Sequence, residues 1–202
     1  MSASVPCTFA PPRRKARRRN DVAAVGGRLR CGRVEFTDRE TGVNVIVEAG
    51  ANYVGVIGAG EGATGEQMVQ ARRVGELLAR KGVRVVTGGL GGVMRAACEG
   101  AVGAGGVTLG LLPGSDRADG NQFLTVSVPT GLGEMRNALV VRSSEAIIAV
   151  GGSWGTLSEI ALAVRTGVPV IALGGWPLPG VEVLVAQSPE EAVEAAVRTL
   201  AR

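Results

Sequence analysis

The sequence predicts a single α/β domain, built as a Rossmann-like, doubly wound parallel sheet of about seven strands. Two features predict this fold: short, almost continuously apolar runs alternate with longer segments of helical periodicity, and several apolar runs end in glycines. Strands that are apolar along their whole length are typical of a parallel sheet covered by helices on both faces. In such sheets, ligands bind beyond the carboxyl ends of the strands, where loops lead into helices.

The predicted elements follow one another from Tyr53 to the end of the chain, within a domain that we place at residues 49–202. A further marginal strand is expected at residues 34–48, where apolar and polar residues alternate weakly. Apolar runs predict strands at residues 53–57, 83–87, 108–113, 123–128, 146–150, 169–173 and 181–185, and periodicity predicts helices at residues 67–82, 92–106, 133–143, 156–166 and 189–201.

The composition excludes several classes of protein. Of 202 residues, 32 are glycine and none is histidine, so catalysis by an imidazole, as in a Ser-His-Asp triad, is excluded. Cys7, Cys31 and Cys98 lack the spacing of a zinc site or a disulfide framework. No apolar run approaches the roughly 18 residues of a membrane span. We therefore expect a cytoplasmic protein with no metal, no cofactor and no membrane partner.

Residues 1–48 are predicted to be a basic, disordered N-terminal extension. Residues 1–33 carry nine Lys or Arg against the single acid Asp21, a net charge of +8, whereas residues 34–202 carry −4. Such a basic cluster can neutralise nucleic-acid phosphates, but no aromatic side chains interleave with the arginines to stack on bases. Nucleic acid is therefore not expected as a partner, except through this extension.

The first glycine loop runs from Gly58 to Ala63 and matches G-x-G-x-x-A, the dinucleotide-binding fingerprint, in its strand–turn–helix context. An NAD site also needs an acidic residue at the end of the next strand, where Thr87 is followed by glycines. NAD binding is therefore disfavoured. Gly58 and Gly60 either contact a ligand or allow a tight turn.

The second glycine loop holds four glycines in five positions, from Gly88 to Gly92. Glycine permits positive φ and a close approach of the backbone, so the amides of this loop are expected to line a phosphate or ribose pocket.

The third loop, Gly151-Gly152-Ser153-Trp154-Gly155-Thr156, follows the most apolar strand and opens a helix. Its amides, the helix dipole and the Thr156 hydroxyl together predict an anion site. No lysine stands where a P-loop requires one, so nucleoside triphosphate hydrolysis of that type is excluded. Glu159, expected in the first turn, either closes a capping box with Thr156 or faces the ligand.

Arg136 starts the helix that precedes residues 146–150. If the strands at residues 123–128 and 146–150 are neighbours, Arg136 and Glu159 project from adjacent helix starts into one crevice. An arginine beside a carboxylate keeps it ionised and orients it. An ordinary surface ion pair is the alternative.

These motifs resemble those of the Lonely Guy family, the cytokinin riboside 5′-monophosphate phosphoribohydrolases. That family's G-G-x-x-G-x-M is matched from Gly88 to Met94, and its P-G-G-x-G-T-x-x-E from Gly151 to Glu159; the resemblance covers about residues 52–200. It implies catalytic roles for Arg136 and Glu159. It further implies phosphate binding by Gly151, Gly152, Ser153, Gly155 and Thr156, and substrate binding by Gly58, Gly60, Gly88, Gly89, Gly92, Met94 and Asn137.

The resemblance implies an enzyme that hydrolyses the N-glycosidic bond of a nucleoside 5′-monophosphate to a base and ribose 5-phosphate. The missing proline of the third loop and Asn137 depart from the family pattern. The run from Glu134 to Ala163 looks closer to a bacterial branch that also resembles the molybdenum cofactor carrier proteins and, distantly, the Rossmann core of the DNA-processing protein DprA. A non-catalytic binder or carrier of a phosphorylated pterin or nucleotide is therefore the alternative. Either protein takes a small phosphorylated ligand, and a homo-oligomer, dimer or tetramer, is expected.

Overall fold

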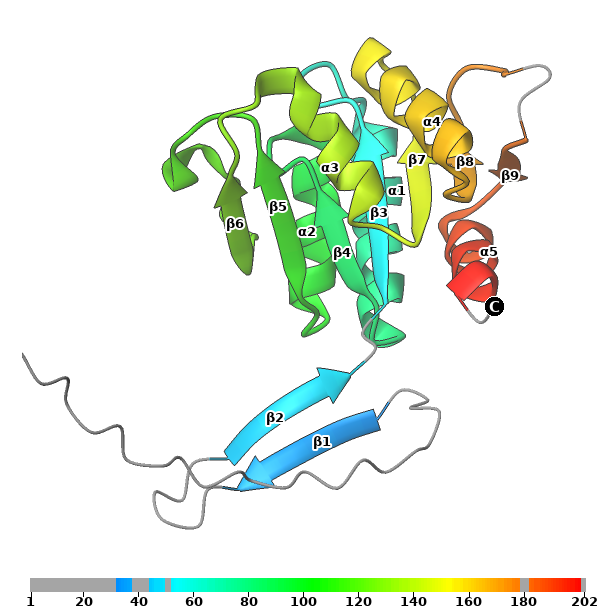
Figure 1. The fold of residues 1–202 in the computed structure, drawn as a ribbon. Helices are drawn as coiled ribbons and strands as arrows, with labels where there is room; N and C mark the ends of the chain where they lie inside the picture. Colours follow the sequence, from blue (N-terminus) through cyan, green and yellow to red (C-terminus); the bar gives the residue numbers. More distant parts are fainter. Residues whose placement is uncertain (1–31, 38–43, 50–51, 179–181, 201–202) are drawn as a thin grey trace, which may run out of the picture. The chain divides into compact units, whose positions relative to one another are not determined.

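The computed structural model describes residues 32–37, 44–49, 52–178 and 182–200. Its main sheet is parallel throughout, with helices on both faces (Figure 1). The strands are β3 (Tyr53–Gly58), β4 (Arg84–Thr87), β5 (Thr108–Leu112), β6 (Val126–Pro129), β7 (Ala146–Val150), β8 (Val170–Leu173) and β9 (Leu184–Ala186). They lie in the order β6-β5-β4-β3-β7-β8-β9. The predicted doubly wound sheet of seven strands is confirmed.

Helices cover the two faces unequally. The described elements are α1 (Gly65–Arg80), α2 (Gly92–Gly103), α3 (Asn137–Arg142), α4 (Trp154–Thr166), α5 (Pro189–Leu200) and the 3-10 turns η1 (Arg117–Asp119) and η2 (Gly133–Arg136). Side chains of α1, α2 and α5 share one buried cluster with the sheet, and those of α3 and α4 share the other. The sheet is therefore enclosed between two helical layers.

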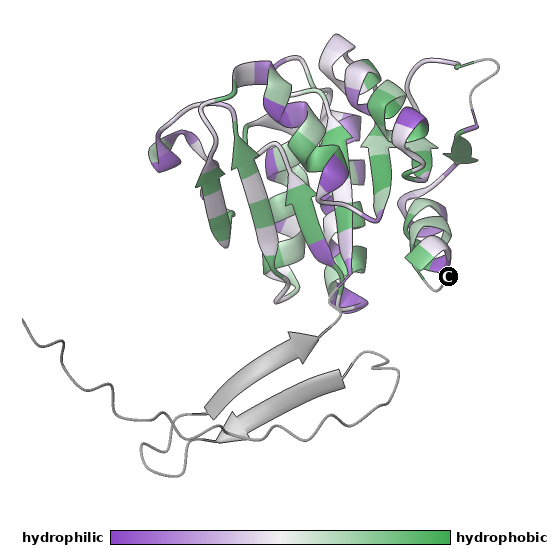
Figure 2. Ribbon diagram, viewed as in Figure 1, coloured by the Kyte–Doolittle hydropathy of each residue, from purple (hydrophilic) through white to green (hydrophobic). Residues whose placement is uncertain are grey.

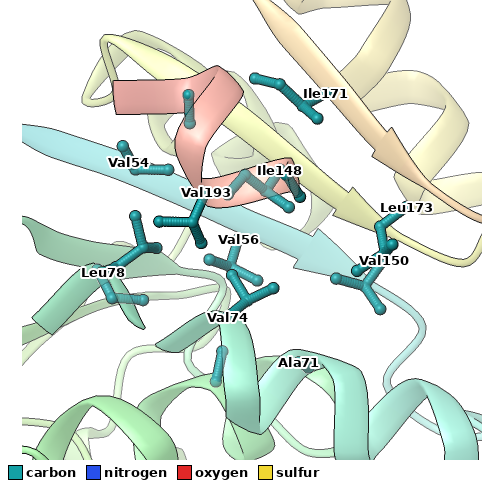
Figure 3. Close-up of a cluster of buried hydrophobic side chains, with 14 of the residues drawn as sticks. Val54, Val56, Ala71, Val74, Leu78, Ile148, Val150, Ile171, Leu173 and Val193 are labelled. Atoms are coloured by element: carbon teal, nitrogen blue, oxygen red, sulfur yellow. The ribbon is translucent and has the colours of Figure 1, made fainter. Parts of the chain in front are cut away.

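The central strands supply both clusters because successive side chains point to opposite faces. In β7, Ile148 and Val150 pack toward α1 and α5, whereas Ile147 and Ala149 pack toward α3 and α4. Figure 3 shows the first cluster, and Figure 2 shows hydrophobic residues along the central strands. All five residues of β7 are buried, which explains why its sequence is an unbroken apolar run.

Two glycines allow α1 and α2 to pack closely. A Cβ atom on Gly75 of α1 would lie 1.9 Å from the carbonyl oxygen of Ala97, and one on Gly100 of α2 would lie 1.9 Å from that of Arg72. No real Cβ tolerates such distances, so the helix backbones are in direct contact at this crossing.

The strand order reverses direction at β3. From β3 the chain moves outward through β4 and β5 to β6, and then returns across the sheet through η2 and α3 to β7, on the other side of β3. The strands at residues 123–128 and 146–150 are therefore not neighbours, and that premise for bringing Arg136 near Glu159 is wrong. The return crossing instead brings η2 to the end of β5, where the Gly133 amide donates to the Pro113 carbonyl, and Arg136 lies against Gly88, which follows β4. Open α/β sheets bind ligands beyond the carboxyl ends of their strands.

Several element bounds differ from the predicted ones. β6 starts at Val126 because the preceding residues bond to a side chain: Thr108 Oγ1 donates to the Phe123 carbonyl at 2.7 Å and accepts from the Thr125 amide at 2.8 Å. The helix predicted at residues 133–143 is divided into η2 and α3. The last strand, at the sheet edge, is Leu184–Ala186, and residue 181 lies outside the described residues.

Residues 34–48 contain parts of two strands where one was expected. β1 (Gly32–Thr37) and β2 (Asn44–Ala49) pair antiparallel as a separate two-stranded sheet. The sequence between them is polar and contains Gly42, which disfavours a continuous strand. Residues 1–31 of the predicted basic extension lie outside the described residues, so the extension remains a prediction.

Candidate functional site

A cavity of about 600 Å³ lies at the carboxyl ends of the central strands. This volume is within the range of small-molecule sites. Residues from the ends of β3 and β5, from α2, η2 and α3, and from α4 enclose it. Its lining consists of Gly58, Gly60, Leu90, Met94, Pro113, Glu134, Arg136, Asn137, Ser153, Trp154, Gly155, Thr156, Ser158 and Glu159. Arg136 and Glu159 are thus brought to one cavity, as are seven of the other residues singled out from the sequence.

The N-terminus of α4 forms one wall of this cavity. Ser153 is its N-cap: its Oγ accepts from the Thr156 amide at 3.2 Å and lies 2.9 Å from the Thr156 hydroxyl. The Leu157 amide donates to the Ser153 carbonyl. The first amides of any helix lack partners within the helix, so those of Trp154 and Gly155 remain available to an anion.

Because α4 begins at Trp154, two predictions about Glu159 are corrected. Glu159 lies in the second turn, and the first turn contains no acidic residue. Thr156 is the third residue of the helix, so Thr156 and Glu159 do not form a capping box; Ser153 caps the helix instead. The Glu159 carboxyl is therefore not occupied by helix capping.

Arg136 ends η2 and is buried, with 7% of its surface exposed. Its Nε is buried and has no hydrogen-bond partner among the described residues. Burial lowers the pKa of the guanidinium, and the charge of Glu159 acts in the opposite direction. A buried cation that lacks a full set of partners is costly in free energy, so this side chain is prepared to receive an anion.

Glu159 is equally buried, at 7% exposure. Burial raises the pKa of its carboxyl to about 7, although the Arg136 charge opposes that shift. The carboxyl therefore changes protonation near neutral pH, as is typical of groups that exchange protons with a ligand.

Five of the glycines predicted to bind the ligand are not part of the cavity lining. A Cβ on Gly88 would lie 2.0 Å from Arg136 Nη1, so this glycine makes room for the guanidinium. Gly151, at φ +67°, packs against the Gln67 side chain in the same way. A Cβ on Gly92 would lie 2.1 Å from the Gly60 carbonyl oxygen. The other two are Gly89 and Gly152.

Sequence reasoning missed five lining residues: Leu90, Pro113, Glu134, Trp154 and Ser158. Four of them lie within or beside motifs already singled out, and Pro113 follows the carboxyl end of β5. It also missed Asn121, whose side-chain amide donates to the carbonyls of Gly89 and Leu90, at 3.1 Å each, and so holds the second glycine loop. No sequence signal marks Asn121, because its partners are backbone atoms 31 and 32 residues away.

Two negative findings concern the described residues alone. They contain no cluster of three His, Cys, Asp or Glu side chains arranged to hold a metal ion. None of their helices has the length and apolarity needed to cross a membrane.

The fold and the cavity define a Rossmann-like protein with a cavity at the switch point of its sheet. The family is also defined by sequence: residues 51–199 match the SLOG cluster4 family, and the chain belongs to it. An uncharacterized protein of Archaeoglobus fulgidus is 44% identical over 140 residues, which are 69% of this chain and 91% of that protein.

Two solved structures with a similar fold are of proteins that bind or carry the molybdenum cofactor. The molybdenum cofactor binding protein of Rippkaea orientalis is 36% identical, with a TM-score of 0.71 over 75% of this chain and 98% of that chain. The molybdenum cofactor carrier protein of Chlamydomonas reinhardtii is 34% identical, with a TM-score of 0.70 over 75% of this chain and 99% of that one. These similarities support a Rossmann-like fold for this chain.

Proposed function

We propose that this chain binds a phosphorylated pterin, such as the molybdenum cofactor, in the cavity and holds it without turnover. Arg136 is the observation that carries the proposal, because its buried Nε lacks a partner in the described part of the chain. An anion beside α4 would compensate the charge of this guanidinium, which lines the cavity. The identity of 34–36% with proteins that bind or carry the molybdenum cofactor supports a pterin as the ligand.

The phosphate is expected at the N-terminus of α4. There it would accept from the free amides of Trp154 and Gly155 and from the hydroxyls of Ser153 and Thr156, with the Arg136 guanidinium opposite. A helix N-terminus favours negative charge, and charge-assisted hydrogen bonds to a guanidinium are stronger than neutral ones. The cavity lining contains neither cysteine nor histidine, so recognition would depend on the phosphate and the organic part of the ligand.

The test is the replacement of Arg136 by methionine, which keeps the length of the side chain and removes its charge. We expect Arg136→Met to weaken binding of ribose 5-phosphate, measured by calorimetry, by at least about tenfold, since a hydrogen bond to a charged group contributes about 1.5–3 kcal/mol. Arg142→Met is the matched control because Arg142 is an exposed arginine of α3. Equal affinity of Arg136→Met and the control would contradict the proposed anion site.

The identity of the ligand is tested by native mass spectrometry of the protein purified under anaerobic conditions. A carrier is expected to retain a phosphorylated pterin, and Arg136→Met is expected to lose it. A retained nucleotide, with no pterin, would contradict the pterin assignment and leave the phosphate site standing.

A second function is favoured by Glu159: hydrolysis of the N-glycosidic bond of a nucleoside 5′-monophosphate. Water would add to the anomeric carbon as the bond to the base breaks, giving the free base and ribose 5-phosphate. The ionised carboxylate would stabilise the oxocarbenium-like charge or take a proton from the water. Because the pKa of Glu159 is raised to about 7, the rate should rise with pH through neutrality.

This second function is tested with a panel of nucleoside 5′-monophosphates, AMP first, by chromatography of the released base. The hydrolase function would be established if the wild type releases the base and Glu159→Gln does not. If the wild type binds the monophosphates and releases no base, hydrolysis is contradicted and only the carrier function remains.

A further inference from the structure

The two tryptophans of the chain are both on the surface of the domain. Trp154 is 80% exposed and Trp176 is 45% exposed, while the buried core is built from aliphatic residues. Tryptophan gains more than most residues from burial, so leaving both rings in water forgoes stabilisation. Their exposure therefore needs a reason other than folding.

The rings are in contact with each other. Their centroids are 5.2 Å apart and their planes are tilted by 59°. Trp154 lines the cavity, whereas Trp176 lines a small adjoining hollow together with Gly151 and Gly152. Trp176 thus supports Trp154 from outside the cavity, and Trp154 is the member of the pair that a ligand would meet.

The loop after β8 is shaped to hold Trp176 in this place. Gly174 and Gly175 have φ of +72° and +95°, values that side chains rarely allow. A Cβ on Gly175 would lie 2.4 Å from the Gly151 carbonyl oxygen, so the loop passes directly against the end of β7. The backbone conformation of this loop therefore places Trp176 against Trp154.

Trp154 is also the first residue of α4, between Ser153 and Gly155 of the anion site. The Trp154 ring therefore lies close to where a phosphate would meet the amides of this turn. The cavity contains further apolar surface at Leu90, Met94 and Pro113. An aromatic face next to an anion site suits a molecule that carries both a phosphate and a flat ring.

We propose that Trp154, supported by Trp176, is the stacking platform for a planar, conjugated ring of the ligand. The ligand is then a phosphorylated heteroaromatic compound, with a pterin or purine ring, rather than a simple sugar phosphate. This assignment rests on the proposed phosphate site. Loss of a base–aromatic stack weakens binding by about 5- to 150-fold.

The first experiment uses fluorescence of the full chain. Trp176→Phe leaves Trp154 as the only tryptophan, so its emission reports on that ring alone. The probes are AMP and 6-hydroxymethylpterin monophosphate, which carry a ring, and ribose 5-phosphate, which does not. We expect a ring-bearing probe to quench Trp154 on binding and ribose 5-phosphate to bind without quenching.

The second experiment compares affinities by calorimetry. Trp154→Ala should lower the affinity for the ring-bearing probe by about tenfold or more and change the affinity for ribose 5-phosphate by no more than about twofold. Trp154→Phe should restore most of the lost affinity. Trp154→Ala is expected to fold because the side chain is exposed, and circular dichroism checks this.

The outcomes separate the two proposals. If ribose 5-phosphate binds through Arg136 but neither ring-bearing probe binds more tightly than ribose 5-phosphate does, the proposed stacking on Trp154 is wrong. The proposed phosphate site would still hold. If Trp154→Ala weakens all probes equally, Trp154 acts on the start of α4 and the platform is again overturned. If no probe binds the wild type, both proposals fail.

Discussion

Glu159 and Arg136 are two ionisable side chains that are each only 7% exposed. Burial lowers the pKa of Arg136 and raises that of Glu159, so the folded protein holds both groups in a solvent-poor site at a cost in stability. Groups kept at such a cost are typical of ligand sites. The cost itself can be measured, because it depends on pH.

The wild type should lose stability as pH rises from 5 to 8, relative to Glu159→Gln. The unfolded carboxyl ionises near 4.5 and the folded one near 7, so the folded state binds more protons over this interval. The free energy of unfolding therefore falls by about 2–3 kcal/mol for the wild type and not for the variant. Urea unfolding at both pH values measures it.

Glu134→Gln is the control for that measurement, since Glu134 lines the same cavity and is exposed. It should follow the wild type at both pH values. A Glu159→Gln protein whose stability also follows the wild type would mean that the Glu159 carboxyl is not held neutral by burial.

At the scale of helices and strands, the α1–α2 crossing makes the sharpest prediction. Gly75→Ala should destabilise the protein by about 1–3 kcal/mol or more, because the new Cβ would meet the Ala97 backbone, which belongs to a packed helix. Gly103→Ala is the matched control: it also lies in a helix, at the end of α2, and its Cβ would meet open space. That change should be neutral or stabilising by up to about 1 kcal/mol.

Both variants are compared by urea unfolding at one pH. A Gly75→Ala protein as stable as Gly103→Ala would show that the two helices separate easily, and that the direct backbone contact is not needed for stability.

Strands and helices differed in how far the sequence could predict them. The central strands β3, β4, β5, β7 and β8 were predicted because apolar residues fill both of their faces. β6 was misplaced because its start depends on Thr108, a partner that hydrogen-bonds through its side chain 17 residues away. The start of α4 was missed because Ser153 and Thr156 are both good caps, and only the backbone decides between them.

The candidate site was predictable to the extent that glycine loops and helix starts mark the carboxyl ends of strands. Arg136 and Glu159 were singled out by residue type, but the strand neighbours assumed for them were wrong, since η2 and not an adjacent strand brings Arg136 to the cavity. Trp154 stood within a recognised motif, yet residue type alone could not show that its ring is exposed beside Trp176.

For the whole molecule, ligand binding should be visible as global stabilisation. Because the cavity lies between elements from both halves of the sheet, binding should oppose unfolding of the whole domain. A ligand at one hundred times its dissociation constant adds about 2.7 kcal/mol, which raises the Tm of a domain of this size by about 5–10 °C. Calorimetric scans with ribose 5-phosphate measure the shift, with ribose as control.

The shift should disappear in Arg136→Met and persist in Arg142→Met. Equal shifts with ribose and ribose 5-phosphate would show that the phosphate contributes nothing to binding.

The backbone contact between the first two glycine loops has a consequence for how relatives of this chain can vary. The Gly92 position touches the Gly60 carbonyl, and the Val93 amide donates to the Ala59 carbonyl at 3.0 Å. A side chain cannot be introduced at position 92 unless the backbone at positions 59 and 60 shifts, so glycine should be retained at position 92 in relatives with this fold. Divergence toward another ligand is then expected on the opposite side of the cavity, at positions such as Glu134 and Asn137, whose side chains can change without rebuilding this junction.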